Sequence, residues 1–164
     1  MSHPFDVLSI PNHPGRLIFT PCPGTKGSSI DSALSTLKQA GADAVLTLMP
    51  YAELTQNAAS DLPALCAAQG LAWLHLPVAD EQVPQADFDA AWPAAMAQIA
   101  ELLAADKAIA IHCKGGSGRT GLIAARILTE LGIARSEAIS LVQALRPKAI
   151  QHPAHAGWIA QFGN

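Results

Sequence analysis

Cysteine is scarce in this sequence. The 164 residues contain only Cys22, Cys66 and Cys113, an odd number at spacings that fit neither a disulfide framework nor a paired metal-ligand motif. We therefore expect a protein of a reducing compartment, with at least one free thiol and no bound metal. Cys22 and Cys66 are interpreted as buried apolar thiols, the commonest fate of a lone cysteine.

Positive charge is also sparse, with ten Lys and Arg residues against thirteen Asp and Glu and a net charge of −3. No cluster holds more than two basic residues. This argues against a nucleic-acid partner, because proteins that bind nucleic acid neutralise many phosphates. We expect no membrane span, because the alanine-rich stretches are interrupted by polar residues and proline, and no secretory leader. A cytoplasmic location is expected.

Half of the residues are apolar, which is enough for a single domain of residues 1–164 to bury a core. Strand-length apolar runs alternate with helical periods, and continuous apolar runs suit parallel strands that are buried on both faces. The pattern predicts an α/β fold with a mostly parallel central sheet flanked by helices. The expected strands are 16–20, 44–49, 71–76 and 108–111. The expected helices are 30–40, 60–69, a long stretch from about 88 to 105, one from about 119 to 131, 136–145 and 154–162.

The helix boundaries are predicted from capping residues. Ser28 or Ser29 should cap the first helix, Ser60 the second and Ser136 the fifth, because serine side chains accept hydrogen bonds from the first turn. Pro93 should either kink the long helix or start a new first turn.

The stretch HCKGGSGRTG, residues 112–121, stands between the 108–111 strand and the next helix. Its glycines let successive backbone N–H groups turn toward one point, and the helix N-terminus adds partial positive charge. Arg119 offers a planar fork for two phosphate oxygens. The same groups stabilise a thiolate, so Cys113 should ionise more readily than a free cysteine. The motif predicts an anion-binding loop with a nucleophile at its centre.

Two other loops share part of this pattern. The nucleotide-binding P-loop is excluded because the stretch lacks the Gly-Lys-Ser/Thr ending that places lysine on the terminal phosphates. A rhodanese-like sulfur carrier also holds a cysteine in such a loop, although its loop normally lacks the Gly-x-Gly-Arg-Thr-Gly ending. A purely structural Cys113 is disfavoured, because a core thiol does not need three glycines and an arginine in the next six positions.

The motif is similar to the phosphate loop of the cysteine-dependent dual-specificity protein phosphatases, in particular the kinase-associated-phosphatase-like subgroup. The matching residues in the loop are His112, Cys113, Gly116, Gly118, Arg119, Thr120 and Gly121. Outside it, the similarity extends to Pro23, Gly24 and Lys26, to Glu53, to the acidic PVAD loop and to the KAIQ segment at 148–151. The resemblance implies a mostly parallel sheet flanked by helices, the class that the apolar pattern also predicts.

These residues predict a two-step phosphoester hydrolysis without a cofactor. Cys113 would attack phosphorus, while Arg119 and the loop amides hold the transferred group. Thr120 would hydrogen-bond the sulfur when Cys113 leaves, and His112 would orient the loop and help to keep the thiol pKa low. The phosphate-binding residues are then Lys114, Gly115, Gly116, Ser117, Gly118 and Arg119.

Asp80 is the expected general acid. It lies in the loop 77–87 after a strand, where ligands of open α/β sheets bind, and it matches the position that the family uses. Glu81 and Asp87 are the alternatives. The resemblance also implies that Gln151 positions the hydrolytic water, although it could be only a surface amide. The remaining candidates, His152 and His155, lack further metal ligands at supporting spacing and are interpreted as structural or exposed.

The leading functional hypothesis is a metal-independent phosphatase that acts on phosphotyrosine in proteins, with phosphoserine and phosphothreonine as further substrates. Lys114 beside the nucleophile also occurs in phosphoinositide phosphatases, but their loops usually carry a second lysine where this chain has Ser117. Phosphoinositides and other small phosphate monoesters therefore rank second. A non-catalytic phospho-binding module ranks third, because Cys113, Arg119 and Thr120 are all present.

Overall fold

The computed structural model describes residues 2–164. Its centre is a five-stranded sheet in the order β1-β2-β5-β3-β4. The four strands from β2 to β4 in this order run parallel, and β1 pairs with β2 in the antiparallel sense. This is the α/β class that the apolar pattern predicts. The strands are β1 (Asp6–Ser9), β2 (Arg16–Thr20), β3 (Ala42–Thr47), β4 (Ala72–His75) and β5 (Ala108–His112).

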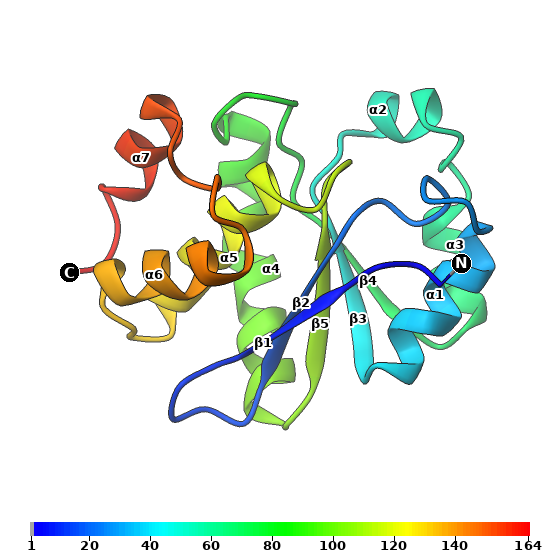
Figure 1. The fold of residues 1–164 in the computed structure, drawn as a ribbon, viewed down its shortest axis with the longest axis horizontal. Helices are drawn as coiled ribbons and strands as arrows, with labels where there is room; N and C mark the ends of the chain where they lie inside the picture. The colour runs from blue at the N-terminus through cyan, green and yellow to red at the C-terminus, as the bar shows by residue number, and fades with distance from the viewer. Residues whose placement is uncertain (1) are drawn as a thin grey trace.

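Helices cover both sides of the sheet (Figure 1). Two of them, α1 (Ile30–Gln39) and α3 (Leu62–Ala68), pack on one face of the sheet, where they contact β3 and β4. The opposite side carries the four other long or C-terminal helices, and the short α2 lies near the ends of the strands. These elements are α2 (Tyr51–Gln56), α4 (Ala86–Ala104), α5 (Gly118–Glu130), α6 (Arg135–Leu145) and α7 (Pro153–Ile159).

The core is divided by the sheet into two hydrophobic clusters. Ile109 and Ile111 of β5 face the cluster beneath α4 and α5, whereas Ala108 and Ala110 face the cluster beneath α1 and α3. This alternation follows from the period of two residues in a strand. Because β5 is central, both sets are fully buried, and each large aliphatic side chain there contributes about 1.5–3 kcal/mol.

The capping predictions are partly confirmed. Ser29 caps α1, because its side chain accepts a hydrogen bond from the Ser32 amide. Ser60 is wrong as a cap, since α3 starts after Asp61 and has a proline in its first turn, where the missing N–H costs nothing. Ser136 is also wrong. α6 starts one residue earlier, and the amide of Arg135 donates to the carbonyl of Asn164 instead of to a side-chain cap.

Two elements were not expected from the sequence. β1 is four residues long and buries only one of them, and α2 buries only Leu54, so neither carries an extended apolar pattern. The long helix α4 runs from Ala86 to Ala104 with Pro93 inside it, so the proline does not start a new helix. None of the helices within residues 2–164 has the length and apolar character needed to cross a membrane.

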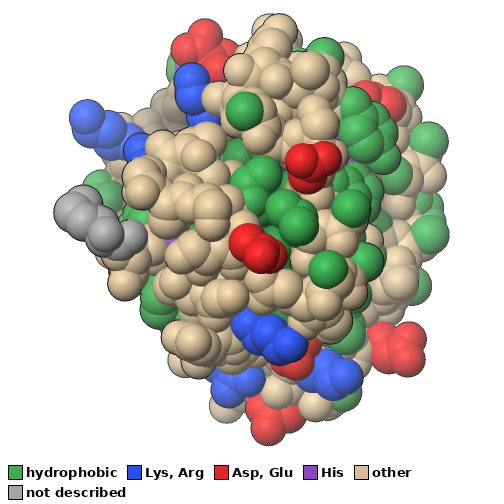
Figure 2. Space-filling view, turned by 90° about the vertical axis from the view of Figure 1, so that its right-hand side faces the viewer, with side chains coloured by type: hydrophobic (Ala, Val, Ile, Leu, Met, Phe, Trp, Pro, Cys, Tyr) green, Lys and Arg blue, Asp and Glu red, His purple; other side chains and the backbone are tan. Residues whose placement is uncertain are grey.

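The surface over α1 and α3 carries little charge. Figure 2 shows hydrophobic and uncharged side chains at the centre of this face, with two isolated acidic side chains among them. Lysine and arginine side chains lie toward the margins of the view and form no continuous basic patch at its centre.

The C-terminal helix is fixed to the core by aromatic rings around Arg126 of α5. The Arg126 guanidinium lies 3.5 Å from the ring centroid of Phe162 and 4.3 Å from that of Trp92. Trp158 of α7 meets Phe88 edge to face at a centroid distance of 6.0 Å. Cation–π contacts of this kind stabilise by about 0.5–2 kcal/mol each, so they hold α7 against α4 and α5.

Candidate active site

Cys113 follows the last residue of β5, at the carboxyl edge of the parallel strands. The loop that begins there ends where α5 starts at Gly118. Cys113 is 3% exposed, and its sulfur accepts hydrogen bonds from the amide of Gly116 at 3.3 Å and from the hydroxyl of Thr120 at 3.2 Å. Both donors stabilise a thiolate, because hydrogen bonds to a charged group favour the charged form.

The loop is held from outside through its carbonyl groups. Nδ1 of His112 donates to the Cys113 carbonyl at 3.0 Å, and Nε of Arg146 donates to the Gly116 carbonyl at 2.8 Å. The amide of Cys22 donates to the Lys114 carbonyl at 3.0 Å. In a trans peptide the N–H points opposite to the C=O, so carbonyls that are held outward turn the following amides inward. The loop therefore presents backbone donors toward its own centre.

Gly116 has a conformation and a position that only glycine fits. Its φ is +77°, and a Cβ there would lie 2.5 Å from the carbonyl carbon of Thr20. The hydroxyl of Thr20 in turn donates to the carbonyl of Pro4 at 2.9 Å. The loop can therefore rest directly on the end of β2 only because this position lacks a side chain.

A buried hydrogen-bond chain fixes the orientation of His112. Trp73 donates from Nε1 to the hydroxyl of Thr47 at 2.8 Å, and that hydroxyl lies 2.7 Å from Nε2 of His112. Because Nδ1 of His112 donates to a carbonyl, Nε2 accepts the Thr47 proton. Burial lowers the pKa of His112 to about 4, although the hydrogen bond to the Cys113 carbonyl raises it. His112 is therefore neutral at pH 7, and it orients the loop through hydrogen bonds rather than through charge.

Arg119 is buried, and its guanidinium is held by a residue of α2 and by the backbone after β4. Its two terminal nitrogens donate to the two carboxylate oxygens of Glu53 at 2.8 and 2.7 Å, and one of them also donates to the Val78 carbonyl at 2.9 Å. Burial acts to lower the pKa of Arg119, but the hydrogen bonds that Arg119 donates to Glu53 and the nearby charges of Cys113, Glu53 and Asp80 outweigh it and raise the pKa overall. The guanidinium is thus held in one orientation with its charge retained.

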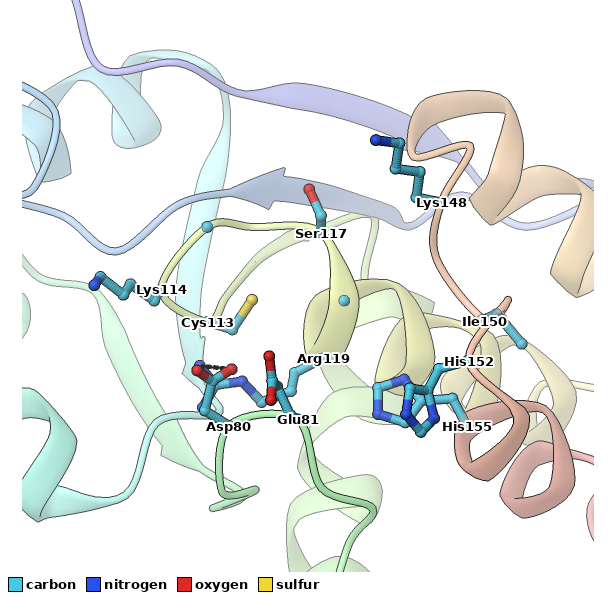
Figure 3. A pocket seen from close by; sticks show the side chains of 12 residues that line it. Asp80, Glu81, Cys113, Lys114, Ser117, Arg119, Lys148, Ile150, His152 and His155 are labelled. Atoms are coloured by element: carbon cyan, nitrogen blue, oxygen red, sulfur yellow. Dashed lines mark ion pairs between the residues drawn. The ribbon is translucent and has the colours of Figure 1, made fainter.

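A pocket of about 670 Å³ opens above Cys113 and Arg119 (Figure 3). Asp80 enters it from the loop after β4 and lies 3.4 Å from Arg119, with 68% of its side chain exposed. Figure 3 shows the thiol between this loop and the loop that carries Ser117. The lining residues are Asp80, Glu81, Cys113, Lys114, Gly115, Ser117, Gly118, Arg119, Lys148, Ile150, His152 and His155.

The sequence also matches a known protein family. A family model described as "Polymorphic toxin system, DSP-PTPase phosphatase" matches residues 23–133, which is more than half of the chain. The chain belongs to this family. It is therefore a cysteine-dependent phosphatase of the dual-specificity type. No curated protein sequence matches it.

Solved phosphatase structures have the same fold. Kinase associated phosphatase (KAP), with its catalytic-site cysteine replaced by serine, is 25% identical with a TM-score of 0.88, and the alignment covers 98% of this chain and 94% of that one. A mutant form of Tk-PTP is 22% identical with a TM-score of 0.72 and coverages of 95% and 93%. Human DUSP28 is 19% identical with a TM-score of 0.66 and coverages of 98% and 94%.

The phosphatase pocket brings together most of the residues that the sequence singles out. Asp80 and Arg119 line it with Cys113 and the exposed part of the loop, whereas His112, Gly116 and Thr120 are buried behind the loop surface. Gln151 does not line the pocket. Its side-chain amide is exposed and donates to the Pro147 carbonyl at 2.7 Å, so its role in positioning water stays a prediction.

The two alternatives to Asp80 differ in position. Glu81 lines the phosphatase pocket. Asp87 does not, because it stands in the first turn of α4 and its carboxylate accepts the amide of Phe88 at 2.9 Å.

The expectations for the remaining cysteines and histidines have different outcomes. Cys22 and Cys66 are buried free thiols, as predicted, and burial raises the pKa of each to about 12.

His152 and His155, interpreted as structural or exposed, both line the pocket of the phosphatase, with ring centroids 5.6 Å apart. Within residues 2–164, no group of three His, Cys, Asp or Glu side chains is placed to hold a metal ion.

Four residues of the pocket wall come from the segment before α7 and from α7 itself. Lys148, Ile150, His152 and His155 belong to this wall. In the sequence, only the KAIQ similarity at 148–151 indicates that this segment contributes to the pocket wall. The residues of α7 show no signal of their own, because they reach the pocket only through the packing of α7 against α4 and α5.

Proposed function

We propose that this phosphatase hydrolyses phosphotyrosine monoesters in proteins, and phosphoserine and phosphothreonine monoesters more slowly, through a phosphocysteine intermediate. The observation that carries the proposal is the placement of Cys113, Arg119 and Asp80 around one open pocket. The thiolate of Cys113 attacks phosphorus, an S–P bond forms and the P–O ester bond breaks. A water molecule then attacks phosphorus, the S–P bond breaks, and inorganic phosphate leaves.

The loop supplies the electrostatic part of the reaction. In this proposal, Arg119 and the backbone amides from Lys114 to Arg119 hold the phosphoryl oxygens. Charge on these oxygens grows and spreads in the transition state, and donors that are already in place require no reorganisation at that moment. The outward hydrogen bonds from His112, Cys22 and Arg146 support this role, because they hold the loop in the form that binds.

Asp80 supplies the proton in this proposal. Protonated, it donates to the leaving oxygen in the first step, and as a carboxylate it accepts a proton from water in the second. Its ion pair with Arg119 at 3.4 Å supports a position at the edge of the phosphate site. Its high exposure also suits a group that exchanges protons with water and contacts a leaving group from outside the loop.

The surface on both sides of Asp80 supports a peptide substrate. A second hollow of about 310 Å³ begins at Asp80 and Lys114 and continues along α2 past Gln56 and Asn57. The phosphate site therefore lies within a longer depression, in which flanking residues of a peptide find room and hydrogen-bonding amides. Ile150, at 5% exposure in the pocket wall, offers an apolar contact for an aryl ring.

Phosphoinositides and other small phosphate monoesters are the second candidate substrates, and the two pocket lysines favour them. Lys114 and Lys148 are exposed, both line the pocket, and neither forms an ion pair within residues 2–164. Further phosphate groups on an inositol ring would find two free cations there.

The free state of all three cysteines supports the proposed cytoplasmic location, because such thiols persist in a reducing compartment.

A comparative phosphate-release assay tests the choice of substrate. The proposal expects a higher kcat/KM for a phosphotyrosine peptide than for soluble inositol phosphates. It also expects that Lys114→Ala with Lys148→Ala changes the peptide rate by less than the inositol phosphate rate. Faster turnover of inositol phosphates, abolished by the double substitution, would instead establish the second candidate.

A further inference from the structure

We propose that His155 is a positioning residue for the general acid. Its Nε2 lies 3.0 Å from the carbonyl of Gln82, two residues after Asp80, and joins α7 to the loop that follows β4. This contact holds the tip of the loop so that Asp80 faces Cys113. The inference rests on the proposed function, in which Asp80 is the acid.

The loop is well fixed at its start but poorly fixed at its tip. The amide of Val78 donates to the Leu48 carbonyl at 2.8 Å, and the Val78 carbonyl accepts from Arg119. In the described chain, two polar contacts join residues 79–84 to other elements. They are the hydrogen bond from His155 to the Gln82 carbonyl and the Asp80–Arg119 ion pair. Without the bond from His155, the polar contacts left at the tip are the Asp80–Arg119 ion pair, the turn between Ala79 and Gln82, and the hydrogen bond from Gln85 to the Val83 carbonyl.

The backbone beside the contact is strained. Glu81 has a φ of +62°, in the left-handed region that non-glycine residues seldom adopt. Such a conformation persists only where the surroundings impose it. Glu81 lies directly between Asp80 and Gln82, so the bond to the Gln82 carbonyl acts at the point where the loop would otherwise relax.

The donor side of the contact is rigid. His155 is 7% exposed, and α7 is held by the edge-to-face contact between Trp158 and Phe88. A carbonyl accepts only, so Nε2 of His155 carries the proton. Burial lowers the pKa of His155, with the hydrogen bond to Gln82 acting in the opposite sense, which is consistent with a neutral ring. In Figure 3 His155 lies on the pocket wall opposite Lys114, with Asp80 and Glu81 between them.

The test compares His155→Leu with His155→Gln, whose side-chain amide can donate to the same carbonyl. Each variant is assayed with aryl phosphates whose leaving groups range from activated to poor, alone and combined with Asp80→Asn. Ala156→Gln, on the exposed side of α7, is the control for a general disturbance of the helix. Thermal unfolding of each variant reports whether it is folded. If His155→Leu does not fold, the test is repeated with His155→Asn, whose amide is too short to reach Gln82.

The expected result is a loss of about 10-fold in kcat/KM for poor leaving groups, as for a slightly misplaced catalytic group, and little loss for activated ones. His155→Gln should recover most of the activity, and His155→Leu should cause no further loss in the Asp80→Asn background. Equal losses for all leaving groups, or an additive loss with Asp80→Asn, would overturn the inference.

The inference and the proposed function fail in different ways. If Asp80→Asn itself leaves the leaving-group dependence unchanged, the proposed acid is wrong and the inference falls with it. If Asp80→Asn behaves as proposed and His155→Leu keeps the parent's leaving-group dependence, only the inference is overturned.

Discussion

The hydroxyl of Thr120 donates to the sulfur of Cys113 over 3.2 Å, from the first turn of the helix α5 that follows the glycine-rich loop. The amide of Gly116 donates to the same sulfur at 3.3 Å. In the proposed mechanism these donors stabilise the sulfur as an anion twice, before it attacks phosphorus and again when it leaves the phosphocysteine. The second event depends on donors that are close enough to act on the departing thiolate.

Thr120→Val should therefore slow the breakdown of the phosphocysteine more than its formation. A hydrogen bond to a charged group contributes about 1.5–3 kcal/mol, which corresponds to roughly 10- to 100-fold in rate. Rapid-mixing assays with a chromogenic aryl phosphate should show a burst of one equivalent of product followed by slow turnover. Thr120→Ser keeps the hydroxyl and should behave like the parent. A valine variant without a burst and with the parent's turnover would remove Thr120 from the mechanism.

Asp80→Asn should reduce the hydrolysis of esters with poor leaving groups by about 10²- to 10⁴-fold, the usual contribution of general acid catalysis. Activated aryl phosphates need little protonation and should lose much less. The measurement is kcat/KM across a leaving-group series. Glu81→Gln and Asp87→Asn are matched controls, since each removes one carboxylate near the same loop. If Asp80→Asn changes neither rate and one of the controls lowers them, that carboxylate is the acid.

Glu53→Ala should destabilise the fold and weaken phosphate binding together. The substitution leaves the buried charge of Arg119 without its two-point partner, a change that typically costs about 3–5 kcal/mol. Glu53 is 15% exposed, so a loss near 3 kcal/mol is expected. Urea unfolding gives the loss, and Glu53→Gln, which keeps one acceptor, should lose less. An unchanged free energy of unfolding would show that the Val78 carbonyl and Asp80 are sufficient partners for Arg119.

Stability should fall between pH 6.5 and pH 4 because of His112. In the folded protein burial holds the pKa of His112 at about 4, whereas in the unfolded chain the ring takes up a proton near pH 6.5. The unfolded state therefore binds more protons in this window, and the free energy of unfolding decreases as pH falls, by about 3 kcal/mol. Burial lowers the pKa of His3, His75 and His155 as well, which adds in the same direction.

Urea unfolding at pH 7 and pH 4.5 measures this loss. A His112→Gln variant should lose less stability than the parent between these pH values, because it lacks the histidine whose folded-state pKa is about 4. An equal loss in the two proteins would assign the pH dependence to other groups.

The residues of the proposed phosphate site can be identified from the sequence because they are local. Cys113, Gly116, Arg119 and Thr120 lie within eight consecutive positions, and a strand before them and a helix after them fix their arrangement. The position of Asp80 also follows from a simple rule, since parallel strands bring their carboxyl ends to one edge of the sheet.

The other parts of the structure depend on contacts between distant residues. The cap predicted at Ser136 is replaced by the carbonyl of Asn164, which no local pattern indicates. His155 is interpreted from the sequence as structural or exposed, and it reaches the pocket only through the packing of α7, where its Nε2 lies 3.0 Å from the carbonyl of Gln82, 73 residues earlier. Short elements such as β1 bury too few residues to produce a pattern, and they form because β2 is there to pair with.

The central claim is that Cys113 is the nucleophile of a hydrolysis that needs no metal. Its most direct test is the turnover of a chromogenic aryl phosphate by the parent protein and by Cys113→Ser, with a metal chelator present throughout. The account predicts full turnover by the parent in chelator and none by Cys113→Ser. Turnover that survives Cys113→Ser or disappears in chelator would contradict it, as would a parent protein that binds a phosphopeptide and releases no phosphate.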